Sequence, residues 1–317
     1  MQSKSGTAAR PPEQREMDLY EDPIIDSGWF DNSARQYRHI AARPLASSMG
    51  AEISGVDVRN LGDLAFAEIE DALFRHKMIY FRNQPISHEE QEAFTARFGP
   101  VATDAYKSQT KGGRKVTTMI KEANEKTPFI FGGGWHSDSP FLRNPPAITI
   151  LRSVDTPPFG GDTMWTNAAL AYHALSPTMK AMIDGLKAYH SAENNLRRVR
   201  RYMDKLRGFS GDDAKQQAMS GSYHPLVRNH PRTGEKALYI SGGYTEGFEG
   251  LTEFEADYLH EFLMDHLLRH AFTCRLRWEP NMLALWDNRL CLHLAMNDHD
   301  GFRREMYRSM VLGEVPI

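Results

Sequence analysis

The sequence predicts a mainly β domain with flanking helices, built as a double-stranded β-helix or jelly roll. Most of the chain after Phe98 consists of short apolar segments separated by Gly, Pro and Asn turns, a spacing typical of antiparallel β domains. Only a few segments place apolar residues at helical spacing. The length of 317 residues suits one large domain with additions.

The N-terminal stretch differs from the rest of the chain. It is rich in Arg, Glu, Gln and Pro and has no periodic apolar positions, so we expect residues 1–36 to be disordered or to form a surface arm. The domain itself is expected to span residues 37–317. A lid or insertion is expected at about residues 190–222.

Helices are expected at the ends and edges of the β structure. Phe66, Ile69 and Leu73 recur at helical spacing, and Ser87 with Glu90 forms the S-x-x-E pattern of a capping box. The predicted helices cover residues 64–77, 87–98, 177–187 and 253–270. The predicted strands include residues 37–58, 78–81, 281–296 and 305–312.

The charge and cysteine content exclude several classes of function. A formal net charge of -3 argues against a nucleic-acid-binding surface, even though residues 197–207 hold a cluster of basic side chains. We interpret that cluster as a solvated helix, or as a lid that brings positive charge near an anionic substrate. The two cysteines lack a Cys-x-x-Cys spacing, and no apolar run has the length of a signal or membrane segment. We therefore expect a cytoplasmic protein that acts on a small molecule, with no nucleic-acid or membrane partner.

A split set of residues predicts a metal site. His136 and Asp138 are two apart, so in an extended segment both side chains project to the same side. Together with the distant His293 they would supply two histidines and one carboxylate, the arrangement that leaves coordination positions open in non-haem Fe(II) oxygenases. By itself a His-x-Asp pair is more often a structural polar loop, and a lone histidine in an apolar segment is more often a core residue.

Three other histidines are not assigned to the metal. His299 lies among Asn, Asp and Gly residues, a turn composition that predicts exposure to solvent. His266 and His270 are four apart on a predicted helix, but the Glu of a His-Glu-x-x-His motif is missing, so we expect them on the helix surface.

Four motifs occur in one order along the chain. They are GWHSDSPF at residues 134–141, GGDT at 160–163, HPLVR followed by HP and TG at 224–234, and WDNR at 286–289. This order resembles the taurine dioxygenase/2,4-dichlorophenoxyacetate dioxygenase family of Fe(II)- and 2-oxoglutarate-dependent enzymes. The resemblance extends from about Ile40 to about Pro316. It implies a cupin-like jelly roll that uses Fe(II), 2-oxoglutarate as co-substrate and O2, and that releases succinate and CO2.

The resemblance also implies roles for individual residues. His136, Asp138 and His293 would ligate the iron. Arg304 would hold the distal carboxylate of 2-oxoglutarate with help from the hydroxyl of Thr163, because a guanidinium offers a two-pronged donor to a carboxylate. Without the resemblance, a threonine after a Gly-Gly-Asp turn would be read as a simple cap.

Substrate contacts are predicted from charge and position. Arg304 and Arg308 flank or fall in the strand at 305–312, and residues 304, 306 and 308 share one face. By its matching position in the family that the chain resembles, Arg308 should project toward the substrate. Lys107 and Trp135 are further candidates for substrate contact, and Trp135 and Trp286 are expected to line the site. These cations suggest an organic anion: a carboxylate, sulfonate or sulfate ester. Taurine itself is not expected, because Gly132 stands where taurine-type members have Asn.

Two alternatives remain open at this point. The substrate could be a larger hydrophobic metabolite, in which case Arg308 would be a structural or co-substrate contact. The chain could also be a non-catalytic sensor of 2-oxoglutarate or metal. In either case the family resemblance suggests a homo-oligomer, a dimer or a tetramer.

Overall fold

The computed structural model describes residues 30–104, 115–128, 130, 132–199 and 219–317. One compact unit spans Asp31–Ile317. The predicted arm lies outside the described residues up to position 29, but Asn32 is buried and its side-chain amide donates to the carbonyl oxygens of Ala46 and Gly50. The compact unit therefore starts several residues before the predicted boundary at 36.

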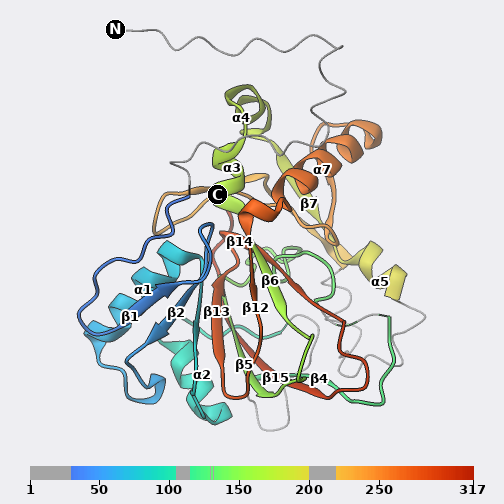
Figure 1. The fold of residues 1–317 in the computed structure, drawn as a ribbon. Helices are drawn as coiled ribbons and strands as arrows, with labels where there is room; N and C mark the ends of the chain where they lie inside the picture. The colour runs from blue at the N-terminus through green and yellow to red at the C-terminus, as the bar shows by residue number, and fades with distance from the viewer. Residues whose placement is uncertain (1–29, 105–114, 129, 131, 200–218) are drawn as a thin grey trace, which may run out of the picture. The chain divides into compact units, whose positions relative to one another are not determined.

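Figure 1 shows the fold and labels the α-helices and many of the strands. The helices are α1 (Asp63–His76), α2 (His88–Ala96), α3 (Ala168–Ala174), α4 (Pro177–Ile183), α5 (Glu193–Val199) and α7 (Glu253–Leu267), with 3-10 turns η2 (Val58–Asn60) and η4 (His270–Phe272). The strands are β1 (Ala41–Pro44), β2 (Ala51–Ser54), β3 (Met78–Phe81), β4 (Thr117–Lys121), β5 (Ile148–Asp155), β6 (Thr163–Asn167), β7 (Lys187–His190), β8 (Ser222–Pro225), β9 (Val227–Asn229), β10 (Lys236–Leu238), β11 (Thr245–Phe248), β12 (Thr273–Leu276), β13 (Leu283–Asp287), β14 (Cys291–Ala295) and β15 (Arg304–Val311).

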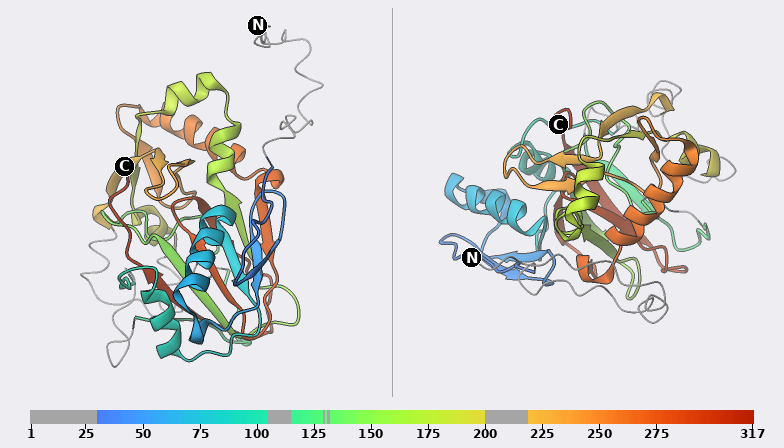
Figure 2. Two further views of the ribbon diagram at one scale, coloured as in Figure 1. Left: turned by 90° about the vertical axis from the view of Figure 1, so that its left-hand side faces the viewer. Right: turned by 90° about the horizontal axis from the view of Figure 1, so that it is seen from above.

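A seven-stranded sheet forms the larger layer, in the order β1-β2-β3-β13-β5-β15-β4. The period-two alternation of its strands gives each face its own core. Ile79 of β3 and Leu285 of β13 join one apolar cluster, to which Leu73 of α1 and Phe94 of α2 also belong. Helices α1 and α2 therefore cover this face of the sheet (Figures 1 and 2).

The opposite face of the large sheet packs on a second sheet of order β12-β6-β14. Met78 and Trp286 from the first sheet share a cluster with Trp165 of β6 and Leu276 of β12. The rings of Trp165 and Trp286 meet edge to face, 5.6 Å between centroids. Two packed sheets with flanking helices confirm the predicted jelly-roll class.

Most predicted helices and strands are present, with shifts at their ends. The capping box at Ser87 and Glu90 is formed in both directions. The helix predicted to reach residue 187 ends at Ile183, because Gly185 adopts a φ of 93° and the strand β7 starts at once. Helices α3 and α5 were not predicted, and each has only seven residues.

One predicted exposure was wrong in this region. His266 is buried, and its Nε2 lies 2.8 Å from the carbonyl oxygen of Ala171 on α3. The unpredicted helix α3 covers that side of α7, whereas His270 is exposed as expected. Within the described ranges, α1 to α7 include no helix with the length and apolar character needed to cross a membrane.

Candidate active site

The site is built on a backbone bridge between two distant segments. The N–H of His136 donates to the carbonyl oxygen of His293 at 3.0 Å, and the N–H of His293 donates back at 2.8 Å. Directly opposed residues of an antiparallel bridge project their side chains to the same face. The two imidazole rings therefore lie together, with 4.1 Å between their centroids.

Asp138 completes this cluster, as the His-x-Asp spacing predicted. Its Oδ1 lies 3.8 Å from His136 Nε2 and 3.9 Å from His293 Nε2. All three residues are buried, and one ligand atom from each lies within 4.8 Å of the others. Two imidazole nitrogens and one carboxylate oxygen that converge in this way fit a divalent transition-metal ion.

Protonation states also favour metal binding. His136 Nδ1 lies 2.6 Å from the carbonyl oxygen of Gly134, so Nδ1 donates and Nε2 keeps its lone pair. Burial lowers the pKa of both histidines, which keeps the rings neutral. Burial alone would raise the pKa of Asp138, but Arg308 and the two histidines outweigh it and hold that pKa at about 2. The carboxylate is therefore ionised at neutral pH.

A hydrogen-bonded chain fixes the second oxygen of Asp138. Thr149 Oγ1 donates to Asp138 Oδ2 at 2.6 Å, and the side-chain amide of Asn288 donates to Thr149 Oγ1 at 2.8 Å. Trp286 Nε1 donates to Asn288 Oδ1 at 3.0 Å. Every member of the chain is buried. Sequence reasoning missed Thr149, and it noted Asn288 only as part of a motif.

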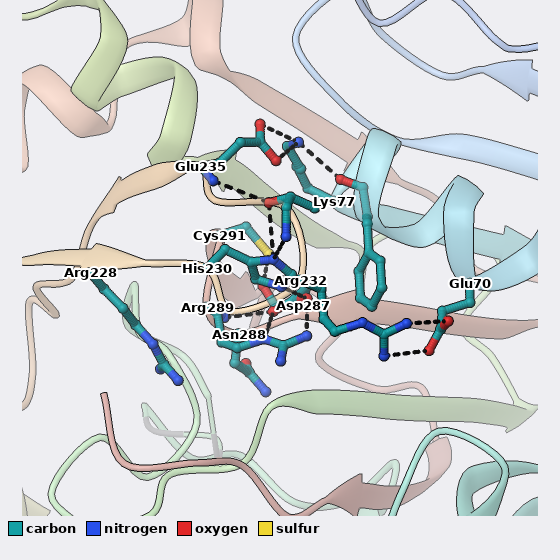
Figure 3. Close-up of polar contacts among 12 residues, drawn as sticks. Glu70, Lys77, Arg228, His230, Arg232, Glu235, Asp287, Asn288, Arg289 and Cys291 are labelled. Atoms are coloured by element: carbon teal, nitrogen blue, oxygen red, sulfur yellow. Dashed lines mark hydrogen bonds and ion pairs between the residues drawn. The ribbon is translucent and has the colours of Figure 1, made fainter. Parts of the chain in front are cut away.

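The turn that carries Asn288 is itself held by buried charges (Figure 3). Asp287 accepts from Arg289 Nε at 2.8 Å and lies 3.0 Å from His230 Nε2. The N–H of Thr233 donates to His230 Nδ1, so Nε2 carries the proton that reaches Asp287. Arg289 also contacts Glu314 near the C-terminus. The HP-TG and WDNR motifs thus form one hydrogen-bonded network that holds the turn with Asn288 in place.

Arg304 and Thr163 lie at the same cavity as the metal-type cluster. Arg304 is buried; its Nε donates to the carbonyl oxygen of Gly161 at 3.0 Å, and its Nη2 has no partner among the described residues. Thr163 Oγ1 accepts from Trp278 Nε1 at 2.9 Å, so its own hydroxyl proton remains available. The cavity is lined by Met119, Gly132, His136, Leu151, Thr163, Trp286, His293, Ala295, Arg304 and Arg308.

Glycine is required beside this arginine. Gly161 has a φ of 67°, and a Cβ there would lie 3.2 Å from Arg304 Cδ. Arg303, which directly precedes β15, instead pairs with Glu122 and Glu305.

His299 is not exposed, contrary to its turn composition. Its ring is buried, and neither ring nitrogen has a partner in the described part of the chain. The loop folds inward because Asp298 Oδ1 accepts from the N–H of Gly161 at 2.7 Å, and because Lys121 donates to Asp300 at 2.6 Å. Burial lowers the pKa of His299 to about 4. It does not belong to the His-Asp-His cluster.

The residues predicted to contact the substrate do not all line the cavity. Arg308 lines the cavity, and its Nη1 donates to Asp138 Oδ1 at 3.0 Å. Its Nη2 donates to Asp104 Oδ2, a partner that sequence reasoning missed. Trp286 lines the cavity as expected, whereas Trp135 is not among the lining residues. Lys107 lies outside the described residues.

Comparisons with known proteins agree with this site. The model of the "Taurine catabolism dioxygenase TauD, TfdA family" matches residues 41–310. An alpha-ketoglutarate-dependent sulfate ester dioxygenase of Pseudomonas putida is 33% identical over 86% of this chain and 90% of its own length. The alpha-ketoglutarate-dependent dioxygenase cnsM of Penicillium expansum is 30% identical over 86% of this chain and 78% of its own.

A solved structure of a taurine dioxygenase from Burkholderia xenovorans has a TM-score of 0.74 and 36% identity to this chain. It aligns with 88% of this chain and 93% of its own. Since the family model spans the region that carries all of the cavity residues, the chain belongs to the TauD/TfdA family of dioxygenases.

Proposed function

We propose that this chain is an Fe(II)- and 2-oxoglutarate-dependent dioxygenase that hydroxylates a small organic molecule, with His136, Asp138 and His293 as the iron ligands. The observation that carries this proposal is the convergence of three buried ligand atoms at one cavity with the buried Arg304, whose Nη2 has no partner among the described residues. Two histidines and one carboxylate leave coordination positions for a chelating co-substrate and for O2.

Arg304 and Thr163 would hold the distal carboxylate of 2-oxoglutarate. The Nη2 of the buried Arg304 has no partner in the part of the chain that the structure describes, and an anion would supply one, because an unpaired buried charge is unfavourable. Burial lowers the pKa of Arg304 to about 10, which still leaves the group charged at neutral pH. The free hydroxyl proton of Thr163 adds a second donor to the same carboxylate.

The protein's own contribution is orientation and the exclusion of water. When bound, iron, 2-oxoglutarate and O2 supply the oxidation, which converts the co-substrate to succinate and CO2 and adds oxygen to a substrate carbon. Met119, Leu151 and Trp286 give the cavity apolar walls. The chain Thr149–Asn288–Trp286 keeps the Asp138 carboxylate in one orientation.

Two substrate classes follow from the sequence, and the contacts of Arg308 bear on both. An organic anion agrees with the relative named for a sulfate ester and with the positive charge of Arg308. The alternative is a larger hydrophobic metabolite with Arg308 as a structural contact, which agrees with the hydrogen bonds of its terminal nitrogens to two carboxylates.

The test is an anaerobic absorbance titration of the metal-free protein with Fe(II) and 2-oxoglutarate. A charge-transfer band should form with the wild type and be lost in His136→Ala and Arg304→Ala. Arg303→Ala is the matched control, because it removes the preceding arginine, which pairs with Glu122 and is not among the cavity residues. Succinate release after admission of O2 distinguishes an enzyme from a sensor, and the absence of any band in the wild type would refute the proposal.

We further expect a homo-oligomer, a dimer or a tetramer. We also expect a reducing, cytoplasmic environment, which suits Fe(II) and the free, buried thiols of Cys274 and Cys291. Residues 37–317 are proposed as the catalytic domain, with the lid at about 190–222 largely outside the described residues.

A further inference from the structure

Ser137 separates the two proposed metal ligands that come from one segment of the chain. The residue is buried, with 1% of its surface exposed, and its Oγ donates to the carbonyl oxygen of Asn288 at 3.0 Å. Side chains alternate along an extended segment, so Ser137 projects away from the side that carries His136 and Asp138. The hydrogen bond therefore holds this segment from the side opposite the His-Asp-His cluster.

The carbonyl group of Asn288 is itself held in place. It belongs to the same peptide unit as the N–H of Arg289, which donates to Asp287 Oδ1 at 2.9 Å. The side chain of Asn288 contacts the ligand segment as well, because its Oδ1 accepts from the N–H of Asp138 at 3.4 Å. Its amide donates to Thr149, which donates in turn to Asp138 Oδ2. Ser137 is thus bonded to a part of the backbone that its own contacts restrain.

The backbone around Asp138 needs such a restraint. The next residue, Ser139, has a φ of 44°, which residues with a side chain rarely adopt. A conformation of this kind persists where neighbouring contacts offset its cost. His136 is fixed by its backbone bridge to His293, and the φ and ψ angles of Ser137 then set where Asp138 lies relative to it. The hydroxyl of Ser137 restrains these two angles.

We propose that Ser137 is a positioning residue whose hydrogen bond to the Asn288 carbonyl fixes the spacing of His136 and Asp138 and so raises affinity for a divalent metal ion. This inference rests on the proposed function, because it concerns the iron ligands named there. The hydroxyl points away from the cluster, so its removal should change the placement of the ligands and not their number.

The test is isothermal titration of the full, metal-free chain with Mn(II), which needs no turnover. Ser137→Ala removes the hydroxyl and should lower Mn(II) affinity by about threefold to tenfold, as the loss of a neutral hydrogen bond would. Ser137→Thr keeps the hydroxyl and should keep the wild-type affinity. The Mn(II)-saturated variants should bind 2-oxoglutarate as the wild type does, because Arg304 and Thr163, which would hold its distal carboxylate, lie on the strands β15 and β6.

Ser48→Ala is the matched control. Ser48 is also buried, its Oγ donates to the carbonyl oxygen of Thr273 at 2.9 Å, and it does not line the cavity. Both alanine variants should lower the free energy of unfolding in urea, but only Ser137→Ala should lose Mn(II) affinity.

Three results would overturn the inference. The first is a folded Ser137→Ala protein that binds Mn(II) as tightly as the wild type, and the second is an equal loss of Mn(II) affinity in Ser48→Ala. The third is an equal loss of 2-oxoglutarate affinity in Ser137→Ala, which would mean general damage to the cavity. Failure of the proposed function differs from all three, because the wild type would then form no charge-transfer band with Fe(II) and 2-oxoglutarate.

Discussion

Thr149→Val tests whether the orientation of Asp138 is set by its buried hydrogen-bond partner. The two side chains have nearly the same shape, but valine cannot donate the 2.6 Å hydrogen bond to Asp138 Oδ2. Valine also leaves the side-chain amide of Asn288 without its acceptor. The Asp138 carboxylate would then keep its contact with Arg308 but lose the hydroxyl that fixes its second oxygen.

The expected loss of Mn(II) affinity follows from the strength of the hydrogen bond between Thr149 and Asp138. A buried hydrogen bond to a charged group contributes about 1.5–3 kcal/mol, and part of that is lost when the metal-binding geometry is no longer enforced. We therefore expect Mn(II) affinity to fall by about tenfold to a hundredfold, the range typical of lost partners of metal ligands. Isothermal titration with Mn(II) in the presence of 2-oxoglutarate measures this directly.

Two further variants make the result specific. Thr149→Ser restores the hydroxyl and should recover most of the affinity. Thr166→Val removes a buried threonine hydroxyl from β6, where it donates to the carbonyl oxygen of Leu267 at 2.6 Å, and should leave Mn(II) affinity unchanged. A folded Thr149→Val protein with wild-type Mn(II) affinity would refute the role assigned to this hydroxyl.

Three other predictions concern binding and stability. Arg304→Lys keeps the charge but loses the planar donor, so 2-oxoglutarate affinity should fall about tenfold or more in isothermal titration. An equal loss of affinity in Arg303→Lys would contradict this. Burial lowers the pKa of His76 to about 4 and of His190 to about 3, so both rings are neutral when folded and protonate on unfolding. This contribution to the free energy of unfolding is complete above about pH 6.5 and is lost as the pH falls, by up to about 1.4 kcal/mol per pH unit for each ring. Urea unfolding of the metal-free protein measures it. A free energy of unfolding that does not change between about pH 7 and about pH 5 would rule it out. Asp287→Asn leaves the buried Arg289 charge with only its longer contact to Glu314 and should lower the free energy of unfolding in urea by about 3–5 kcal/mol. A loss below about 1 kcal/mol would show that the network is not needed.

The parts of the site that the sequence predicted are those governed by local spacing. His136 and Asp138 meet because residues two apart in an extended segment share a side. Arg304 and Arg308 share the buried face of β15 for the same reason. The distant partner His293 was assigned from a family resemblance, since spacing alone gives no signal for a bridge between separate segments.

The parts that were missed depend on contacts far along the chain. Thr149 is an ordinary β-branched residue in an apolar strand, and only its neighbours reveal that its hydroxyl faces a carboxylate. Asp104 meets Arg308 across a separation of 204 residues, which no local pattern encodes. His299 was expected in solvent because composition describes a turn but not whether that turn folds inward.

The backbone bridge between His136 and His293 has a kinetic consequence. Since each amide is held by the carbonyl of the other residue, the backbones of His136 and His293 separate only when this pair of hydrogen bonds opens. An ion bound to both rings would oppose such an opening, because the opening pulls the two ligands apart. Metal binding should therefore slow amide hydrogen exchange at His136 and His293 by the same factor, because one opening event exposes both amides.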